Sequence, residues 1–371
     1  MRQRKSDGPP KGGTVIIKVD PVKPDPGKMR EAAGFVKRGD VVVFPTETVY
    51  GIGASALDPS ACSAIFRIKG RPADNPLIVH VSSMDMARKV GRIPPKYERA
   101  LLAAWPCPLT LIVEAMPGIP DAVTAGLKTV ALRMPAHPVA LALIDQAGVP
   151  IAAPSANPSK KPSATNGSQA IKYFDGEVGC IIDAGRSFFG VESTIIDTSS
   201  FTVLRPGPFT IEEIGRIFGE KPRATAVTKG MKSADSPISP GTKYAHYAPE
   251  TPLLLSECGT EALLDMLAVQ HDIPEFAFIG SGESCAAVAK ETGCSTIALG
   301  DAGNLYEVAK NLYDGLILLD SLKVGFGIIE SFPESGIGLA IMNRIRKASS
   351  GMAFRDEEQL SSLLYGIVSR T

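Results

Sequence analysis

Short apolar runs alternate with amphipathic segments along residues 14–219, which is the pattern of an α/β domain. The apolar runs predict strands over 14–19, 41–44, 49–54, 77–81, 109–115, 130–134, 149–153, 180–183, 193–197 and 201–204. Helices are predicted over 25–39, 59–69, 96–104, 137–147 and 211–218. Because several strands follow one another without a helix between them, the sheet should be mixed rather than purely parallel.

The C-terminal part alternates more regularly. Strands are predicted over 253–255, 276–279, 296–299 and 315–320, and helices over 260–269, 283–291 and 304–313. This order predicts a smaller, Rossmann-like domain with a parallel sheet over 251–371. Residues 220–250 lack apolar periodicity and are rich in Lys, Pro, Ser, Thr and Gly, so they are interpreted as a linker. Residues 1–13 lack the apolar core of a signal peptide and are expected to be a disordered lead-in.

Two further features of the C-terminal part are interpreted structurally. The segment GSGES at 280–284 precedes a helix and could bind phosphate, but it lacks the third glycine of the dinucleotide fingerprint, so we interpret it as a structural turn. A helix predicted over 339–348 carries Arg344, Arg346 and Lys347. We interpret these side chains as a solvated or domain-facing surface.

The stretch 41–81 combines several polar features in one strand–helix–strand unit. An apolar strand runs into the segment PTET at 45–48, which places hydroxyls and backbone N–H groups at a strand end. The following helix, with Asp58 as N-cap and Gly70 just past its end, delivers Lys69 and Arg71 as a basic terminus. Arginine and lysine beside such a turn suit a polyanion such as a nucleoside triphosphate. Each of these pieces is common by itself, and their combination is more specific.

Composition limits the function classes. The chain has 39 Lys+Arg against 39 Asp+Glu, which argues against binding nucleic acid through bulk electrostatics. Its six cysteines are scattered without a C-x-x-C pair, which predicts a reducing, cytoplasmic setting and no structural zinc site. Neither a G-x-S-x-G elbow nor a Walker lysine is present, so the hydrolase and P-loop ATPase readings lose support. The remaining polar groups can bind and orient anions without supplying a covalent nucleophile.

The motifs PTETVYGIG, KGRP and NPLIVHV occur in this order and spacing, followed by PCPLT, ALRMP, APSANPSKKPSAT, ESTIID and LRPG. Together they resemble the YrdC-type L-threonylcarbamoyladenylate synthases. SPGTKYAHYAP at 239–249 is similar to the linker of the longer, two-domain (Sua-type) members. The resemblance implies a YrdC-like catalytic domain over 14–219, a linker or lid over 220–250 and the C-terminal domain over 251–371.

The resemblance also implies the reaction. L-threonine, bicarbonate and ATP, with Mg²⁺ accompanying the ATP, would give threonylcarbamoyl-AMP, pyrophosphate and water. The product would be passed to a threonylcarbamoyl-transferase machinery that forms N6-threonylcarbamoyladenosine at position 37 of tRNAs reading ANN codons. Weak RNA binding is a further possible property. No membrane partner is expected, because no apolar run approaches the roughly 20 residues needed to cross a bilayer.

The resemblance assigns two sets of residues by their positions in the motifs. Those expected around threonine are Thr48, His80, Arg133, Ala153 and Ser193, with Arg133 pairing with the amino-acid carboxylate. Those expected around ATP are Lys69, Arg71, Asn75, Thr110, Ser155, Ser163, Arg205 and Tyr244, of which Lys69 and Arg71 are the expected catalytic residues. Tyr50 and His246 are second-rank candidates. Cys107 of PCPLT stands where relatives commonly have glycine, which weakens the expectation for Thr110.

Two alternatives stay open at the level of sequence. A double-stranded RNA or tRNA binding protein without turnover could use Lys69, Arg71, Lys160 and Lys161 for phosphates, although the zero net charge counts against it. Transfer of the adenylate to a protein is the other alternative, and the missing acylphosphatase and zinc-finger modules count against that.

Overall fold

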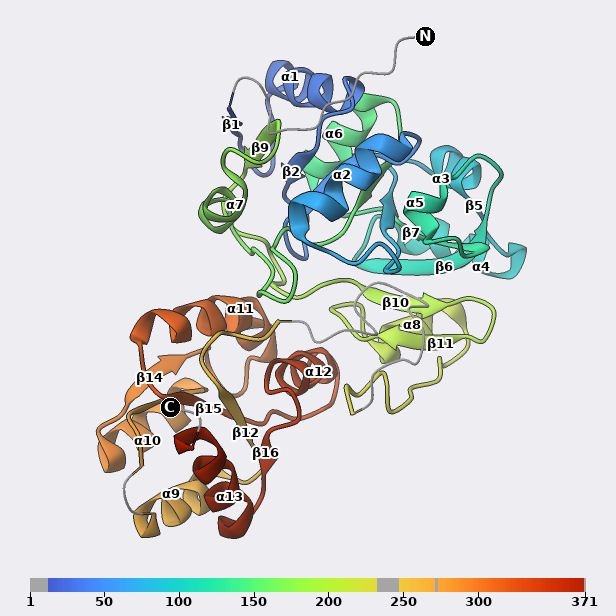
Figure 1. The fold of residues 1–371 in the computed structure, drawn as a ribbon. Helices are drawn as coiled ribbons and strands as arrows, with labels where there is room; N and C mark the ends of the chain where they lie inside the picture. Colours follow the sequence, from blue (N-terminus) through green and yellow to red (C-terminus); the bar gives the residue numbers. More distant parts are fainter. Residues whose placement is uncertain (1–12, 232–246, 271–272, 370–371) are drawn as a thin grey trace. The chain divides into compact units, whose positions relative to one another are not determined.

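The computed structural model describes residues 13–231, 247–270 and 273–369 (Figure 1). These residues fall into two compact units, one formed by residues up to 159 together with 164–187, the other by 160–163 together with 188 onward. The lead-in expected over 1–13, apart from Gly13, and residues 232–246 of the expected linker lie outside the described residues.

A mixed sheet forms the centre of the first unit, as predicted. Its strands lie in the order β1-β9-β2-β3-β8-β4-β7-β6, and β5 pairs with β6. The pairs β1–β9, β2–β9 and β4–β7 are parallel, whereas β2–β3, β3–β8, β4–β8 and β6–β7 are antiparallel. The strands are β1 (Val15–Lys18), β2 (Val42–Phe44), β3 (Gly51–Ser55), β4 (Ile78–His80), β5 (Gly91–Arg92), β6 (Leu109–Ala115), β7 (Thr129–Arg133), β8 (Ile151–Ala153) and β9 (Cys180–Asp183).

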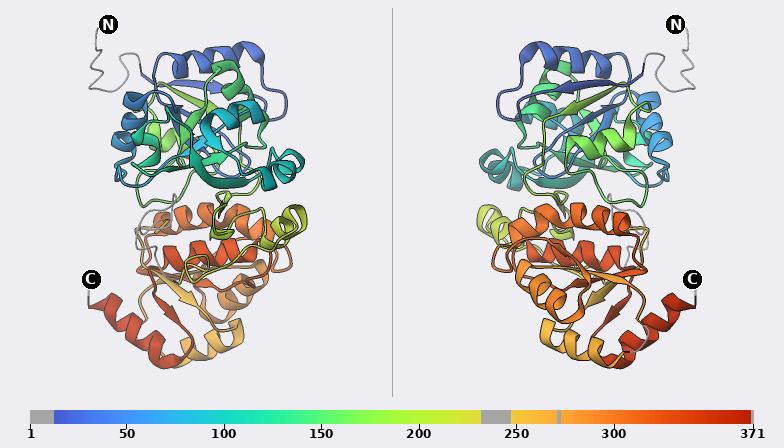
Figure 2. Two further views of the ribbon diagram at one scale, coloured as in Figure 1. Left: turned by 90° about the vertical axis from the view of Figure 1, so that its right-hand side faces the viewer. Right: turned by 90° about the vertical axis from the view of Figure 1, so that its left-hand side faces the viewer.

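The helices of the first unit begin and end where local signals place them. They are α1 (Pro26–Lys37), α2 (Pro59–Lys69), α3 (Met84–Val90), α4 (Pro95–Ala104), α5 (Asp121–Thr124), α6 (Pro138–Ala147) and α7 (Gly167–Phe174). Asp58 accepts hydrogen bonds from the first amides of α2, and Gly70 ends that helix in the left-handed conformation, with φ 61°. Helices α1 and α6 lie side by side (Figures 1 and 2) and form a core with Val42, Phe44 and Ile151.

One glycine makes a close approach within this sheet possible. A Cβ atom at Gly53 of β3 would lie 2.8 Å from the Cβ of Ala153 and 2.8 Å from the Cγ2 of Ile151. Such distances are far below van der Waals contact, so only glycine lets β3 pack this closely against β8. Ala153, an expected threonine-binding residue, lies at this close approach.

The second unit contains an antiparallel strand pair and a parallel sheet. Strands β10 (Thr194–Asp197) and β11 (Thr202–Arg205) pair antiparallel, and α8 (Ile211–Phe218) follows with a capping box. Among the described residues, five parallel strands form a sheet in the order β14-β13-β15-β12-β16, which confirms the predicted Rossmann-like domain. These strands are β12 (Leu253–Ser256), β13 (Phe276–Gly280), β14 (Ser295–Ala298), β15 (Phe326–Glu330) and β16 (Ala353–Phe354).

Helices cover both faces of this parallel sheet (Figures 1 and 2). On one face α9 (Thr260–Val269), α10 (Gly282–Thr292) and α13 (Glu357–Val368) share a core with Phe278 and Phe326. On the other face α11 (Leu305–Leu322) and α12 (Gly338–Ala348) pack against each other.

The strand predicted over 315–320 is wrong, because these residues form the C-terminal half of α11. Leu312, Leu316 and Leu319 are buried and recur at helical spacing, so one face of a helix accounts for the apolar run. Gly315 lets α11 approach the sheet, because a Cβ atom there would lie 2.7 Å from Leu299 Cδ2. The strand of this region is β15, further along the chain.

The turn at 280–284 has a side-chain carboxylate as its partner. Ser281 caps α10 by accepting a hydrogen bond from the Ser284 amide, and the Ser281 amide donates to Glu330 Oε1 at 3.0 Å. A carboxylate therefore already binds an amide that a phosphate would need.

Candidate active site

Three buried polar side chains form a row across the sheet of the first unit. Thr110 on β6 pairs with Arg133 on β7, and Arg133 pairs in turn with His80 on β4. Directly paired residues on neighbouring strands project to the same face of a sheet. All three side chains are buried. Ile78, two residues before His80, pairs with Ala153 on β8, which places Ala153 on this face as well.

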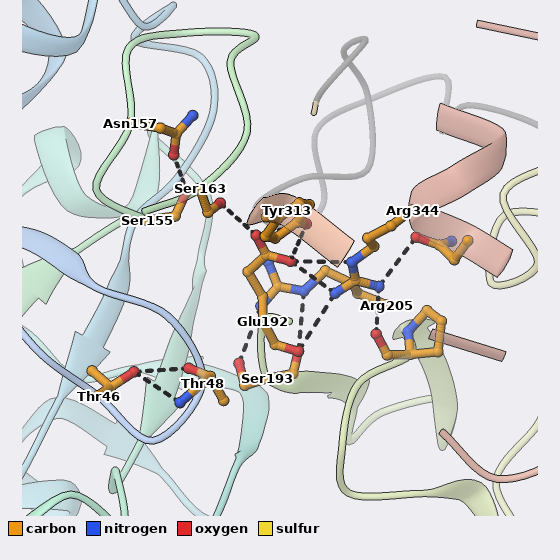
Figure 3. Close-up of polar contacts among 12 residues, drawn as sticks. Thr46, Thr48, Ser155, Asn157, Ser163, Glu192, Ser193, Arg205, Tyr313 and Arg344 are labelled. Carbon is orange, nitrogen blue, oxygen red and sulfur yellow. Dashed lines mark hydrogen bonds and ion pairs between the residues drawn. The ribbon is translucent and has the colours of Figure 1, made fainter. Parts of the chain in front are cut away.

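Arg133 is held by the segment PTET between β2 and β3. Its Nη2 donates to Glu47 Oε1 at 2.6 Å and to Thr48 Oγ1 at 3.0 Å. The Thr48 hydroxyl also lies 2.8 Å from the Thr46 hydroxyl (Figure 3). Two atoms of this cluster, Glu47 Oε2 and Arg133 Nε, are buried without a hydrogen-bond partner. Buried groups in that state are costly, so the pair offers one acceptor and one donor to a ligand.

His80 is a neutral imidazole. Burial, then the nearby Arg133 guanidinium, lower its pKa to about 3. Its Nδ1 lies 3.2 Å from the carbonyl oxygen of Ile78, which can only accept a hydrogen bond and so favours the proton on Nδ1. The ring packs edge-on against Phe44, with the centroids 5.9 Å apart. At neutral pH His80 can therefore offer hydrogen bonds but no positive charge.

Lys69 anchors the loop that follows β8. It lies in the last turn of α2, is buried, and donates from Nζ to the carbonyl oxygens of Ser155, at 2.6 Å, and of Asn157. The Ser155 hydroxyl donates to Asn157 Oδ1 at 2.6 Å (Figure 3). These contacts bring together Lys69 and Ser155, both predicted for ATP. Asn157 was not predicted.

Arg71 shapes the turn after α2. Its guanidinium donates to the carbonyl oxygens of Asn75, at 3.3 Å, and Pro76, at 3.1 Å. Asn75 is buried, and its Oδ1 has no hydrogen-bond partner. Lys69 and Arg71 are thus both engaged with backbone oxygens.

In the second unit, a buried carboxylate organises the other predicted residues. Glu192, two residues before β10, accepts a hydrogen bond from the Ser163 hydroxyl at 2.7 Å. The Tyr313 hydroxyl of α11 lies 3.0 Å from Glu192 Oε1 and 2.9 Å from Oε2, and Arg344 Nη2 of α12 lies 3.0 Å from Oε2 (Figure 3). Burial alone would raise the pKa of Glu192, but Arg344 and then Arg205 lower it to about 2, so the carboxylate is ionised.

Arg205 on β11 holds Ser193. Its Nε donates to the Ser193 carbonyl oxygen at 3.0 Å and its Nη2 to the Ser193 hydroxyl at 3.1 Å (Figure 3). Burial lowers the pKa of Arg205. The structure therefore brings together Ser193, predicted for threonine, and Arg205, predicted for ATP.

Arg344 decides between the two interpretations of the helix at 339–348. Its side chain is fully buried, and Nη1 donates to the Pro206 carbonyl oxygen at 2.6 Å. The solvated interpretation is therefore wrong for Arg344. The partner Glu192 lies 152 residues earlier, so no local signal in the helix revealed the pair.

The second-rank residues have different outcomes. The hydroxyl of Tyr50 donates to the carbonyl oxygen of Gly185 at 2.7 Å and accepts from the Ala184 amide at 3.2 Å, which is a structural role. Tyr244 and His246 lie outside the described residues. Glu47, Asn157, Glu192, Tyr313 and Arg344 were not predicted as site residues, although Glu47, Asn157 and Glu192 stand inside the motifs PTET, APSAN and ESTIID.

Neither a membrane span nor a metal cluster emerges from the described ranges. No helix within 13–231, 247–270 and 273–369 is long and apolar enough to cross a membrane. In the same ranges, no three His, Cys, Asp or Glu side chains lie close enough together to hold a metal ion.

Comparisons with known proteins identify the family of the chain. Residues 34–207 match a family model that groups Sua5, YciO and YrdC and is described as "Telomere recombination", and residues 209–350 match one described as "Threonylcarbamoyl-AMP synthase, C-terminal domain". The threonylcarbamoyl-AMP synthase of Pyrococcus abyssi is 42% identical over 91% of this chain and 98% of its own length, and that of Bacillus subtilis is 41% identical over 91% and 97%.

A solved structure is similar over the same range. The crystal structure of Pyrococcus abyssi Sua5 complexed with L-threonine is 40% identical, covers 92% of this chain and 99% of its own, and has a TM-score of 0.84. The chain belongs to the family of two-domain, Sua5-type threonylcarbamoyl-AMP synthases.

Proposed function

We propose that this protein makes threonylcarbamoyl-AMP from L-threonine, bicarbonate and ATP. The identity of 41–42% to two threonylcarbamoyl-AMP synthases over 91% of the chain carries the proposal. A relative of the same fold has been crystallised with L-threonine, which supports threonine as a substrate. The product would serve the threonylcarbamoyl-transferase machinery that modifies adenosine 37 of tRNAs reading ANN codons.

Threonine would bind in the first unit, at the cluster of Arg133, Glu47 and Thr48. The unpartnered Arg133 Nε can donate to a carboxylate, and the unpartnered Glu47 Oε2 can accept from an ammonium group. An amino-acid zwitterion carries one group of each kind, which supports this assignment. Neutral His80 and the small Ala153 on the same face would contact the side chain. Ser193 is the remaining assignment for threonine that the motifs imply.

The chemistry needs little beyond alignment. The threonine ammonium group would first lose a proton, and the resulting amine would combine with bicarbonate, releasing water, to form a carbamate. A carbamate oxygen would then attack the α-phosphorus of ATP, forming one P–O bond as the bond to pyrophosphate breaks. The substrates supply both nucleophile and leaving group, so the protein contributes proximity and charge stabilisation.

ATP is assigned to residues of several motifs. Lys69 and Arg71 would leave some of their backbone partners to meet the triphosphate, because a phosphate competes well for charged donors. The remaining assignments are those of the motifs: Asn75, Thr110, Ser155, Ser163, Arg205 and Tyr244.

Mg²⁺ would arrive as part of its ATP complex. The two carboxylates near the assigned residues, Glu47 and Glu192, are paired with Arg133 and Arg344. These two carboxylates are therefore not free to coordinate Mg²⁺, and phosphate oxygens and water would hold the ion.

The catalytic part would span 14–219, residues 220–250 would join it to the C-terminal domain at 251–371, and the cytoplasm would be the site of action. The boundary between the two compact units differs from this division, because residues 188–219 belong to the same unit as the C-terminal residues. Segments that carry ESTIID and LRPG are thus part of the second unit.

The test is pyrophosphate release by the purified protein, with L-threonine and bicarbonate each present or omitted and the adenylate detected by mass. Release that requires both co-substrates, together with a mass of threonylcarbamoyl-AMP, is the expected result. Pyrophosphate release that does not depend on threonine would refute the proposal, and so would the absence of release from the folded protein with Mg²⁺. A tRNA titration at several salt concentrations would then test RNA binding.

A further inference from the structure

The segment 190–194 contains Ser193, which is predicted to bind the substrate threonine. The packing partners of this segment come from the C-terminal domain. Gly190 lies directly on α11: a Cβ atom there would be 2.5 Å from the Cα and the carbonyl oxygen of Lys310. Three residues of α11 and α12 thus reach this segment, since Tyr313 and Arg344 both bind the Glu192 carboxylate.

Gly207 of the motif LRPG packs directly against the backbone of the same segment. A Cβ atom there would be 2.4 Å from the Thr194 amide nitrogen and 2.5 Å from the Glu192 carbonyl oxygen. Arg344 contacts the same place through the Pro206 carbonyl oxygen, at 2.6 Å. The backbone on both sides of Ser193 is therefore packed against other backbone and cannot shift independently.

We propose that Glu192, held by Tyr313 and Arg344 of the C-terminal domain, is a positioning residue that sets Ser163 and Ser193 for the substrates. In this role Glu192 takes no part in the chemical step. The inference rests on the proposed function, and it gives the C-terminal domain a part in substrate binding without a ligand of its own.

The hydrogen bonding of Glu192 determines what Ser163 can do. The single hydroxyl proton of Ser163 is donated to Glu192 Oε1 at 2.7 Å. The Ser163 oxygen then presents only lone pairs to a ligand, so it can accept from a ribose hydroxyl or the adenine amino group but cannot donate to a phosphate. A carboxylate that stays ionised keeps this polarity constant, and Arg344, then Arg205, lower the pKa of Glu192 to about 2.

Tyr247 packs against Tyr313 and Arg344, the two residues that bind the Glu192 carboxylate. Its ring lies 5.2 Å from the ring of Tyr313, and the Arg344 guanidinium carbon lies 5.8 Å from its centroid. Tyr247 also has φ 72°, which is rare for a residue with a side chain.

The experiment is a double-mutant cycle on ATP binding in turnover. Tyr313→Phe removes the hydroxyl that binds Glu192 and keeps the ring against Tyr247. We expect the KM for ATP to rise about tenfold, as for the loss of one hydrogen bond to a charged group, with kcat within about twofold of the wild type. Ser163→Ala should raise the same KM, and the double variant should be no worse than the worse single variant.

Two further variants make the outcome decisive. Tyr365→Phe makes the same change on an exposed residue of α13 and should leave every constant unchanged. If Tyr313→Phe does not fold, Glu192→Gln combined with Arg344→Met removes both buried charges at similar volume and replaces it in the cycle.

Additive effects on the KM for ATP, or a lower melting temperature of Tyr313→Phe with unchanged KM values, would overturn the inference and leave only a structural role for Glu192. Those results require an active wild type, so they leave the proposed function intact. A wild type without turnover would instead refute the proposed function.

Discussion

Replacement of Lys69 by methionine should impair both the loop at 154–159 and catalysis. The ammonium group is buried and donates to two backbone oxygens, of Ser155 and Asn157. Methionine has a similar length and removes the charge and both hydrogen bonds. A hydrogen bond from a charged donor contributes about 1.5–3 kcal/mol, and water can reach part of this loop, so we expect the free energy of unfolding to fall by about 2 kcal/mol.

The catalytic effect should be larger than the loss of stability implies. If Lys69 also meets the triphosphate in the transition state, kcat/KM for ATP should fall by about 100-fold or more, which corresponds to about 2.7 kcal/mol. Pyrophosphate release measures kcat/KM and urea denaturation measures stability. Lys37→Met is the matched control, because Lys37 lies in the last turn of α1 but is exposed. A kcat/KM of Lys69→Met within twofold of the wild type would refute the reasoning.

Three other changes have distinct expected results. Arg133→Lys should raise the KM for threonine about 10-fold or more with little effect on the KM for ATP, because lysine cannot reproduce the guanidinium contacts with Glu47 and Thr48; steady-state kinetics with each substrate varied would show it. His80 has a pKa of about 3 in the folded protein against about 6.5 in the unfolded chain, so the free energy of unfolding falls as the pH drops below about 6.5. Between pH 7 and pH 5 the wild type should lose about 2 kcal/mol more of this free energy than His80→Gln. Urea denaturation at both pH values measures the losses, and equal losses would contradict this prediction. Gly53→Ala should cost about 1–3 kcal/mol of unfolding free energy through overlap with β8, whereas Gly366→Ala, in open space on α13, should cost nothing.

Local signals in the sequence predicted much of the fold. Helix α2 begins after Asp58 and ends at Gly70 as predicted, because an N-cap carboxylate and a left-handed glycine act over a few residues. Strands β6 and β9 also have the predicted bounds. The strand predicted over 315–320 failed because this short window is almost wholly apolar. It contains the exposed Leu318 beside the buried Leu316 and Leu319, so hydrophobicity does not reveal the helical period there.

The site residues differ in how far their partners lie along the chain. Thr48 and Arg133 were assigned to one substrate from motifs, and the structure places their side chains 3.0 Å apart. The polar partners of those residues could not be predicted in the same way. Glu47 binds Arg133 across 86 residues and Glu192 binds Arg344 across 152, and neither composition nor periodicity encodes such a pairing. Only the burial of a charge requires that a partner exist.

The distance between Glu192 and Arg344 along the chain also affects how the protein is made. Ribosomes add about 5–20 residues per second, so the 152 residues between the two side chains take roughly 8–30 s to synthesise. Until Arg344 has left the exit tunnel, the Glu192 carboxylate lacks the guanidinium that pairs with it directly, and the segment around β10 cannot reach its final packing. The first unit, which ends at Ser187, contains no residue from this late part of the chain. The nascent protein should therefore mature in two stages, with the packing of the segment ESTIID completed only after Arg344 has emerged from the ribosome.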